Sequence, residues 1–237
     1  MEIIEGMEIF DLSLYLPNEK VLVLGDVHIG YEETLNKQGI LIPRFQFENV
    51  MEKVSRIVRE LDAETIVFNG DIKHEFGKIS DTEWKQSLEL LDFLIAASKK
   101  VIFVRGNHDK TLGPIALKRE IEIVDYYSLD GVFICHGDQI FDNEEFRKAK
   151  TIVIGHEHPA VSLRKDGRTE TFKCFLKGKY KRKNLIVMPS FNLVAEGSDV
   201  LRERLLSPFL KDISNFEVFI VADEIYNFGR IKDIKNL

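Results

Sequence analysis

The stretch TIVIGHEH, residues 151–158, joins a short apolar run to a pair of histidines. Four apolar or β-branched residues followed by Gly155 favour a buried strand that ends where the polar residues begin. His156 and His158 then lie at the end of that strand, on either side of Glu157. One such histidine alone is more typical of an ordinary structural residue than of a ligand. The rest of the chain decides between these interpretations.

The same pattern of an apolar run that ends in polar residues recurs along the chain. It is found at residues 21–28, 65–74, 101–109 and 132–136. The chain has six histidines, and all of them lie at or beside such strand ends. Open α/β sheets place their ligand crevice at the carboxyl ends of their strands, so the pattern predicts one shared site.

Amphipathic helical stretches separate the strands of the front half. Apolar residues at three- and four-residue spacing predict one helix after Pro43 that reaches Leu61. They predict a second helix from Asp81, the expected N-cap, to Ser98. From Ile121 onward short strands dominate, which predicts an α/β fold of two packed sheets flanked by helices. We expect a single domain over residues 1–237.

The composition bounds the class of protein. Hydrophobic residues make up 44% of the 237 residues, which is enough for the core of one large domain. The sequence shows neither a membrane-spanning run nor a signal peptide. Cys135 and Cys174 lie far apart outside any CxxC motif, which favours a reduced, cytoplasmic protein. The net charge of −6 argues against a protein that coats nucleic acid non-specifically.

A basic segment, defined as residues 164–183, departs from this acidic balance. Two acids, Asp166 and Glu170, accompany its basic residues. Those basic residues are Arg164, Lys165, Arg168, Lys173, Lys177, Lys179, Lys181, Arg182 and Lys183. The segment is interpreted either as a solvated hairpin or as a patch that attracts a polyanion such as DNA or RNA. Its start, six residues after His158, is expected to lie close to the shared site.

The donor groups at the strand ends indicate metal binding. Seven are available, namely Asp26, His28, Asp71, Asn107, His136, His156 and His158. Seven ligands are more than one ion uses, and oxygen with imidazole donors suits Mn²⁺, Fe²⁺ or Zn²⁺. Side chains two residues apart on an extended strand point to the same side. We therefore expect Asp26 and His28 to point the same way, and likewise His156 and His158 if the strand geometry continues through them. Two ions about 3.5–4 Å apart suit in-line attack at phosphorus, so phosphate-ester hydrolysis is predicted.

Five short blocks in order resemble the calcineurin-like metallophosphoesterase superfamily. They are DVH at 26–28, GD at 70–71, GNHD at 106–109, HG at 136–137 and GHEH at 155–158. The resemblance implies a four-layer α-β-β-α sandwich of two mixed β-sheets with a dinuclear site along one edge. It implies that one ion is held by Asp26, His28, His158 and a bridging Asp71. The other would be held by Asp71, Asn107, His136 and His156.

The resemblance also implies catalytic residues that do not bind metal. His108 would stabilise the transition state or protonate the leaving group, and Asp109 would orient it. Glu157 is expected to face away from the metals. Protein-phosphatase relatives have an Arg after the bridging Asp, whereas this chain reads Asp71-Ile72-Lys73-His74. His74 resembles the additional histidine of SbcD-type nucleases, although a surface loop residue is the alternative.

Further runs resemble the small SbcD-related phosphoesterases, which include proteins associated with DNA repair. They are GILIPR at 39–44, KHEF at 73–76, KCFL at 173–176 and MPSFN at 188–192. We therefore expect a phosphodiesterase or nuclease that uses two divalent ions, Mn²⁺ foremost, with Fe, Ni or Zn as alternatives. A phosphomonoesterase or nucleotidase and a non-catalytic metal-binding scaffold are the competing functions. No membrane partner is expected, and a homodimer is left open.

Overall fold

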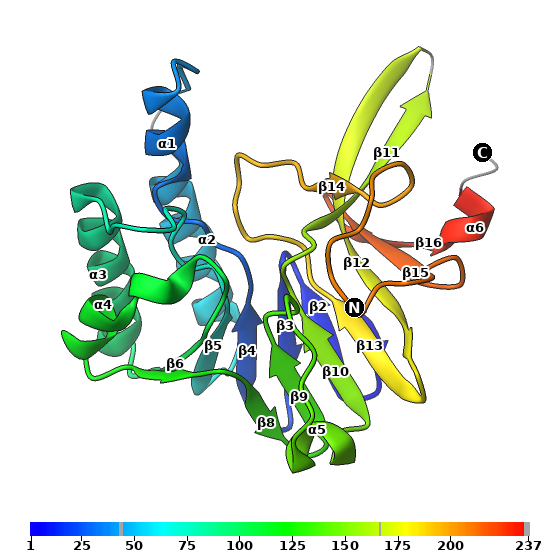
Figure 1. Cartoon of the computed structure of the whole chain (residues 1–237), viewed down its shortest axis with the longest axis horizontal. Helices are drawn as coiled ribbons and strands as arrows, with labels where there is room; N and C mark the ends of the chain where they lie inside the picture. Colours follow the sequence, from blue (N-terminus) through cyan, green and yellow to red (C-terminus); the bar gives the residue numbers. More distant parts are fainter. Residues whose placement is uncertain (43–44, 166, 235–237) are drawn as a thin grey trace.

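The computed structural model describes residues 1–42, 45–165 and 167–234 as two β-sheets packed face to face, with helices on the outer faces (Figure 1). This is the predicted α/β sandwich. Pro43 and Arg44 of the GILIPR run and Asp166 of the basic segment lie outside the described residues, as does the side chain of Lys165.

The first sheet is mixed. Its strands are antiparallel from β1 to β4 and parallel from β4 to β7. In spatial order they are β1 (Glu2–Ile4), β2 (Met7–Phe10), β3 (Ser13–Leu16), β4 (Val21–Leu24), β5 (Thr65–Asn69), β6 (Lys100–Val104) and β7 (Glu122–Val124). The sequence did not predict β1 to β3, because alternation over three or four residues is too short to identify a strand.

The second sheet is also mixed, and β9, β10 and β13 run parallel in it. Its path is β14 (Ser198–Asp199), β11 (Pro159–Lys165), β12 (Arg168–Tyr180), β13 (Lys183–Val187), β10 (Thr151–Ile154), β9 (Val132–Cys135) and β8 (Tyr127–Leu129). From β12 the sheet continues through β15 (Glu217–Val221) to β16 (Ile225–Arg230). The hairpin of β11 and β12 projects beyond the rest of the sheet (Figure 1).

The helices cover the outer faces. They are α1 (Tyr31–Lys37), α2 (Gln46–Glu60), α3 (Asp81–Ala96), α4 (Gly113–Leu117), α5 (Glu144–Lys148) and α6 (Ile231–Ile234). The first sheet packs on α2 and α3, and the second packs on α5, α6 and the irregular chain before β15. Among the described residues, no helix has the length and apolar character needed to cross a bilayer.

Successive side chains of one strand face different cores. In β10, Val153 packs between the sheets, whereas Ile152 and Ile154 pack against the outer layer. In β4, Val23 likewise faces the second sheet and Leu24 faces the helices. Because both faces are buried, these strands are continuous apolar runs. Their polar residues are confined to the strand ends, where the two sheets meet at one edge.

The start of α3 differs from the expected one by a residue. Ser80, rather than Asp81, is the N-cap, since its side chain accepts the Glu83 amide at 3.1 Å. The Glu83 carboxylate accepts the Ser80 amide at 2.8 Å in return. This reciprocal capping box satisfies two amides at once, which explains why the serine is preferred over the aspartate.

Candidate dinuclear metal site

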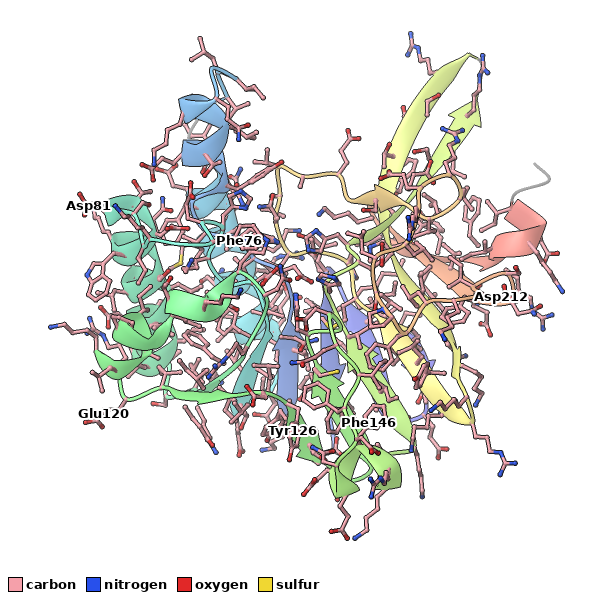
Figure 2. The ribbon with its side chains drawn as sticks, in the orientation of Figure 1. Phe76, Asp81, Glu120, Tyr126, Phe146 and Asp212 are labelled. Carbon is pink, nitrogen blue, oxygen red and sulfur yellow. The ribbon has the colours of Figure 1, made fainter. Side chains whose placement is uncertain are left out.

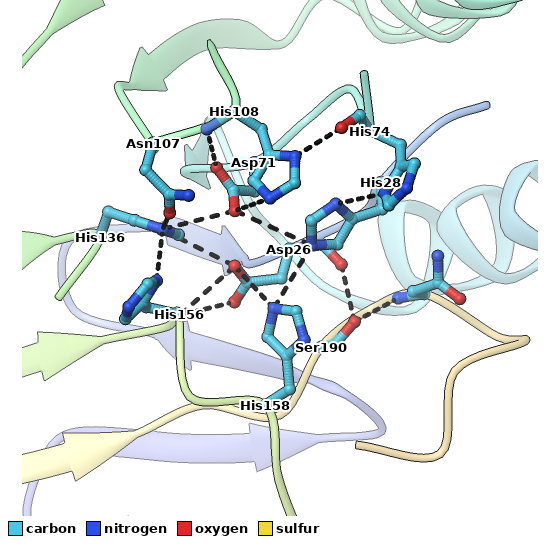
Figure 3. Close-up of polar contacts among 12 residues, drawn as sticks. Asp26, His28, Asp71, His74, Asn107, His108, His136, His156, His158 and Ser190 are labelled. Atoms are coloured by element: carbon cyan, nitrogen blue, oxygen red, sulfur yellow. Dashed lines mark hydrogen bonds and ion pairs between the residues drawn. The ribbon is translucent and has the colours of Figure 1, made fainter. Parts of the chain in front are cut away.

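The predicted donor residues converge at the carboxyl ends of five parallel strands (Figure 3). Asp26 and His28 follow β4, Asp71 follows β5 and Asn107 follows β6. His136 follows β9, and His156 and His158 follow β10. Ligand atoms of Asp26, His28 and His158 all lie within 4.8 Å of one another, as do those of Asp26, Asp71 and His136. Residues from both sheets therefore share one centre.

Five of these residues have left-handed backbone conformations. The φ angles are +55° at Asp26, +50° at His28, +49° at Asp71, +64° at His156 and +49° at His158. The expectation that the pairs at 26/28 and 156/158 lie on extended strands was wrong. They lie in turns instead, where such φ angles cost non-glycine residues of order 1–3 kcal/mol each.

Two glycines of the motifs permit the close packing of these turns. A Cβ atom at Gly106 would lie 2.1 Å from Oδ1 of Asp71. A Cβ atom at Gly155 would lie 2.4 Å from Oδ2 of Asp26. Neither residue has a positive φ, so glycine is required here for space and not for backbone freedom. The glycines of GNHD and GHEH thus let each carboxylate approach a neighbouring loop.

Side-chain and backbone contacts from the chain after β13 hold the loop that carries Asp26. The Ser190 hydroxyl donates to the Asp26 carbonyl at 2.8 Å. The amide of Phe191 donates to the Gly25 carbonyl at 2.8 Å, and that of Asn192 to the Asp26 carbonyl at 3.2 Å. The MPSFN run has no predicted role beyond its family resemblance. Its supporting role is a long-range tertiary contact, for which the sequence carries no local signal.

The first group of donors is centred on Asp26. Nε2 of His158 lies 3.1 Å from Oδ1 of Asp26 and 3.4 Å from Nε2 of His28. Nε2 of His28 also lies 3.8 Å from Oδ2 of Asp71. The donor atoms of Asp26, His28 and His158 thus lie close together, and the Asp71 carboxylate lies beside them.

The second group surrounds His136. Its Nε2 lies 3.5 Å from Oδ2 of Asp71, 2.9 Å from Oδ1 of Asn107 and 3.1 Å from Nδ1 of His156. The same Oδ2 atom of Asp71 therefore approaches the donors of both groups. This placement fits a carboxylate that bridges two ions.

The electrostatics of the pair of buried carboxylates favour a cation. Burial, together with repulsion from Asp26 and Asp109, raises the pKa of Asp71 well above its usual range. Burial also opposes ionisation of Asp26, but attraction from His158, His136 and His28 lowers its pKa. Burial lowers the pKa of His28 and of His136, which favours the neutral imidazole that metals bind. Without a cation Asp71 therefore tends to keep its proton, which a bound metal ion would displace.

His108 lies beside the first group, since its ligand atom and those of His28 and His74 are within 4.8 Å of one another. Its Nε2 lies 3.8 Å from Oδ2 of Asp71, and its amide donates to Oδ1 of the same carboxylate at 2.9 Å. Its Nδ1 lies 2.5 Å from the carbonyl oxygen of His74. Since a carbonyl only accepts, Nδ1 carries a proton and Nε2 faces the site.

Asp109 does not make the expected contact with the His108 ring. Its carboxylate accepts the amides of Ile72 at 3.1 Å and Gly106 at 3.0 Å. The orienting contact comes from the His74 carbonyl instead. Asp109 therefore joins the loops after β5 and β6, and it acts on His108 only through the backbone.

The His74 side chain lies beside the first group. Its Nδ1 is 3.4 Å from Nδ1 of His28, and burial and His108 lower its pKa to about 4. The rings of His74 and Tyr31 are 4.7 Å apart. The structure thus places His74 at the site and not on a remote surface loop.

Glu157 faces away from the donors, yet it is buried. Its Oε2 accepts the amides of Leu206 and Ser207, both at 2.9 Å. The glutamate of GHEH therefore anchors the turn that carries His156 and His158 to the chain between β14 and β15. Nothing in the local sequence distinguishes this role from that of a surface residue.

The basic segment does not form one patch. Strand β12 runs antiparallel to β13, so its first residues lie at the site edge and its last residues at the opposite edge. Lys173 and Lys181 are eight residues apart, which separates them by roughly 25 Å along the strand. Lys177 pairs with Glu217 of the neighbouring strand β15 at 3.7 Å. Exposed Arg164 and Arg168 are near the tip of the projecting hairpin, on the side of the sheet that carries the site and roughly 20 Å along β11 from His158.

The aromatic residues of the basic segment are also structural. Phe175 is fully buried between the sheets, and Phe172 and Tyr180 pack against the outer core of the second sheet. Phe175 is therefore not available to stack on a base, and Phe172 and Tyr180 are each partly covered by that core.

Comparisons with known proteins identify the family and the fold. A family model described as calcineurin-like phosphoesterase matches residues 19–223. The crystal structure of the Pseudomonas putida nuclease MPE is similar, with a TM-score of 0.66, 20% identity and 92% of each chain covered. Vps29 from Entamoeba histolytica, complexed with Zn²⁺, has a TM-score of 0.38 and 15% identity over 88% of this chain and 99% of that one. No curated protein gives a significant match.

Proposed function

Because the chain belongs to the calcineurin-like phosphoesterase family, it is a hydrolase of ester bonds, and we propose that it cleaves phosphodiesters of nucleic acids or nucleotides. The observation that carries the proposal is the complete set of donors gathered around Asp26 and Asp71. A scaffold that had lost its chemistry would be expected to lack some of them. The set supports a metal-dependent reaction with two divalent ions.

The proposed ligand sets follow the two groups of donors. Asp26, His28 and His158 hold one ion, and Asn107, His136 and His156 hold the other. Asp71 contributes to both, since its Oδ2 lies 3.8 Å from His28 and 3.5 Å from His136. Carboxylate, amide and imidazole donors without thiolates suit Mn²⁺, with Fe, Ni or Zn as alternatives. When bound, two such ions lower the pKa of a water molecule and neutralise charge on the phosphoryl oxygens.

The chain's own contribution to bond cleavage centres on His108. The His74 carbonyl holds Nδ1 and thereby directs Nε2 into the site. A proton on Nε2 can pass to the departing oxygen, which avoids release of an unprotonated alkoxide. The negative charge of a bound phosphodiester favours the doubly protonated ring. Asp109 serves as a positioning residue, and His74 contributes both its carbonyl and its ring to this side of the site.

Two features support a diester over a monoester. The residue after Asp71 is Ile72, so the chain lacks the arginine with which protein phosphatases grip a terminal phosphate. Arg164 and Arg168 on the projecting hairpin supply positive charge at the site edge, where a longer polyanion would pass. The fold neighbour from Pseudomonas putida is a nuclease, and the same class of substrate is proposed here.

A cytoplasmic location is proposed from the two buried, unpaired cysteines.

A parallel assay separates the candidate functions. The protein is stripped with chelator, reloaded with Mn²⁺, and supplied with bis(p-nitrophenyl) phosphate or p-nitrophenyl phosphate. We expect the diester to be hydrolysed with the larger kcat/KM. A preference for the monoester would establish the phosphomonoesterase instead, and hydrolysis of neither would support the non-catalytic scaffold. Single-stranded DNA, duplex DNA, RNA and cyclic nucleotides then define the natural class.

A further inference from the structure

Phe76 is an exposed aromatic residue beside the candidate site (Figure 2). Its relative exposure is 55%, and its ring centroid lies 3.6 Å from that of His108, with 32° between the planes. Single exposed apolar residues are ordinary on protein surfaces, so exposure alone argues nothing. The position matters because His108 is the group proposed to protonate the leaving oxygen.

The loop that carries Phe76 is held firmly while the ring stays exposed. The amides of His74 and Glu75 donate to Oε1 of the buried Glu83, at 3.0 Å and 2.8 Å. The Thr34 hydroxyl donates to the Glu75 carboxylate at 2.9 Å. A side chain fixed in this way loses little entropy when a ligand packs on it. Phe76 is thus a preorganised apolar surface.

The neighbouring rings extend this surface toward the first group of donors. His74 lies 5.5 Å from His108 between ring centroids, at 31°, and Tyr31 lies against His74. By contrast, the aromatic residues of the basic segment are packed into the cores. Phe76 therefore offers an exposed aromatic face adjacent to the proposed reaction centre.

We propose that Phe76 determines substrate specificity by stacking on the base of the nucleoside that departs from the scissile phosphate. The proposal rests on the phosphodiesterase function given above. The departing side is assigned because the ring lies against His108. A base in a duplex is already stacked on both sides, so this contact favours single-stranded or frayed substrates. The face of an aromatic ring accepts any base, so little sequence preference is expected.

Dinucleotides test the proposal directly. The Mn²⁺-loaded protein is supplied with thymidylyl-thymidine and with two analogues, each of which has a base-free tetrahydrofuran residue on one side of the phosphate. Loss of the departing base is expected to lower kcat/KM of the wild type by about tenfold to a hundredfold. Phe76→Ala should cleave that analogue and the full dinucleotide at similar rates, and Phe76→Trp should keep the preference. Phe228→Ala, which removes an exposed phenylalanine of β16, is the matched control and should keep it too.

The ratio of kcat/KM between the dinucleotides distinguishes stacking by Phe76 from mere support of the His108 ring. If Phe76→Ala slows all three dinucleotides by one common factor, Phe76 only supports the imidazole and the proposal is wrong. It is also wrong if the wild type has no preference for a base on the departing side. Hydrolysis of bis(p-nitrophenyl) phosphate without cleavage of any dinucleotide would contradict the stacking proposal but would still support the phosphodiesterase function. Failure to hydrolyse any diester would contradict both the stacking proposal and the phosphodiesterase function.

A binding measurement in chelator gives an independent result. In Phe76→Trp the new indole should be quenched by single-stranded oligothymidylate and less by a duplex of equal length. The wild type, which contains only Trp84, should show no such quenching. Equal quenching by both oligonucleotides, or none, would contradict stacking at this position.

Discussion

At the residue scale, the site depends on side chains that are presented by strained turns. Asp26, His28, Asp71, His156 and His158 all have positive φ angles, which a non-glycine residue adopts at a cost. Such conformations persist where surrounding contacts specify them, as the Ser190 hydroxyl does at the Asp26 carbonyl. Positive φ also occurs outside the site, for example at Lys20 and Ser98, so it is the convergence of the five donors, and not the strain alone, that points to function.

His108→Ala should lower turnover by about 10²- to 10⁴-fold, the usual range for loss of a general acid. The metal content should stay close to that of the wild type, since His108 is not among the proposed ligands. The loss should be smaller with a p-nitrophenolate leaving group, which departs without a proton, than with an alkoxide. Activity is measured on aryl and alkyl diesters, and metal content by elemental analysis. Loss of both ions from the variant would contradict the assigned role.

Lys173→Met should change how stability depends on pH. Burial lowers the pKa of the Lys173 ammonium to about 8, below its unfolded value of 10.5. The unfolded chain therefore binds more protons between these values, so this group makes the native state more stable as pH rises from 8 to 10.5. The variant removes a destabilising charge but also the hydrogen bond from Lys173 to the Ser190 carbonyl, so its advantage should be at most about 3 kcal/mol below pH 8 and should vanish toward pH 10.5. Urea unfolding of the metal-free proteins measures the difference, and a pH-independent difference would exclude this cause.

At the scale of elements, strand direction decides what the basic segment can do. The antiparallel pairing of β12 with β13 sends Lys181 and Arg182 to the edge opposite the donors. It leaves Arg164 and Arg168 on the hairpin at the site edge. Charge counting along the sequence treats these residues as one run, and only the pairing register divides them.

The double variant Arg164→Gln, Arg168→Gln should bind single-stranded DNA more weakly at low salt. If each arginine neutralises one phosphate, the slope of log K against log salt should fall in magnitude by about 1.4. Lys181→Gln, Arg182→Gln removes the same charge from the far edge and should leave both affinity and slope unchanged. Fluorescence anisotropy over a series of salt concentrations measures both. An equal loss in the two variants would show that net charge, rather than the hairpin, governs binding.

At the scale of the whole molecule, the site exists because two sheets meet at one edge. β4, β5 and β6 supply Asp26, Asp71 and Asn107 from the first sheet. β9 and β10 supply His136 and His156 from the second. Ions held between the sheets would join parts of the chain that are far apart in sequence, so metal binding is expected to be coupled to folding of the predicted single domain.

Mn²⁺ should therefore raise the unfolding temperature of chelator-treated protein. At a free concentration 100 times the dissociation constant the gain is about 2.7 kcal/mol, which corresponds to a rise of about 5–10 °C for a chain of this length. His156→Ala is the suitable comparison, because His156 is only partly buried and its loss removes a proposed ligand without opening the core. Calorimetry should show a smaller Mn²⁺-dependent rise in the variant. A rise as large as that of the wild type would argue that His156 does not bind the ion.

The sequence by itself determined much of this protein. Apolar runs that end in Asp26, Asp71, Asn107, His136 and His156 predicted the strands, the sandwich and the residues that gather at its edge. These features are local, because a strand buried on both faces must be apolar and its end is the first place where a polar side chain is tolerated. The helices with clear apolar stripes were predicted for the same reason.

The tertiary structure decided what depends on distant contacts. Helix α1, whose residues lack an apolar stripe, was not predicted, and neither the left-handed turns nor the Ser190 and Glu157 anchors have a local signature. The contact of His108 with the His74 carbonyl replaced the one expected from Asp109. The burial of Phe175 and the exposure of Phe76 likewise follow from packing and not from the sequence pattern. Residue type and spacing fix which chemistry is available, whereas the packing of two sheets fixes which groups meet and which face solvent.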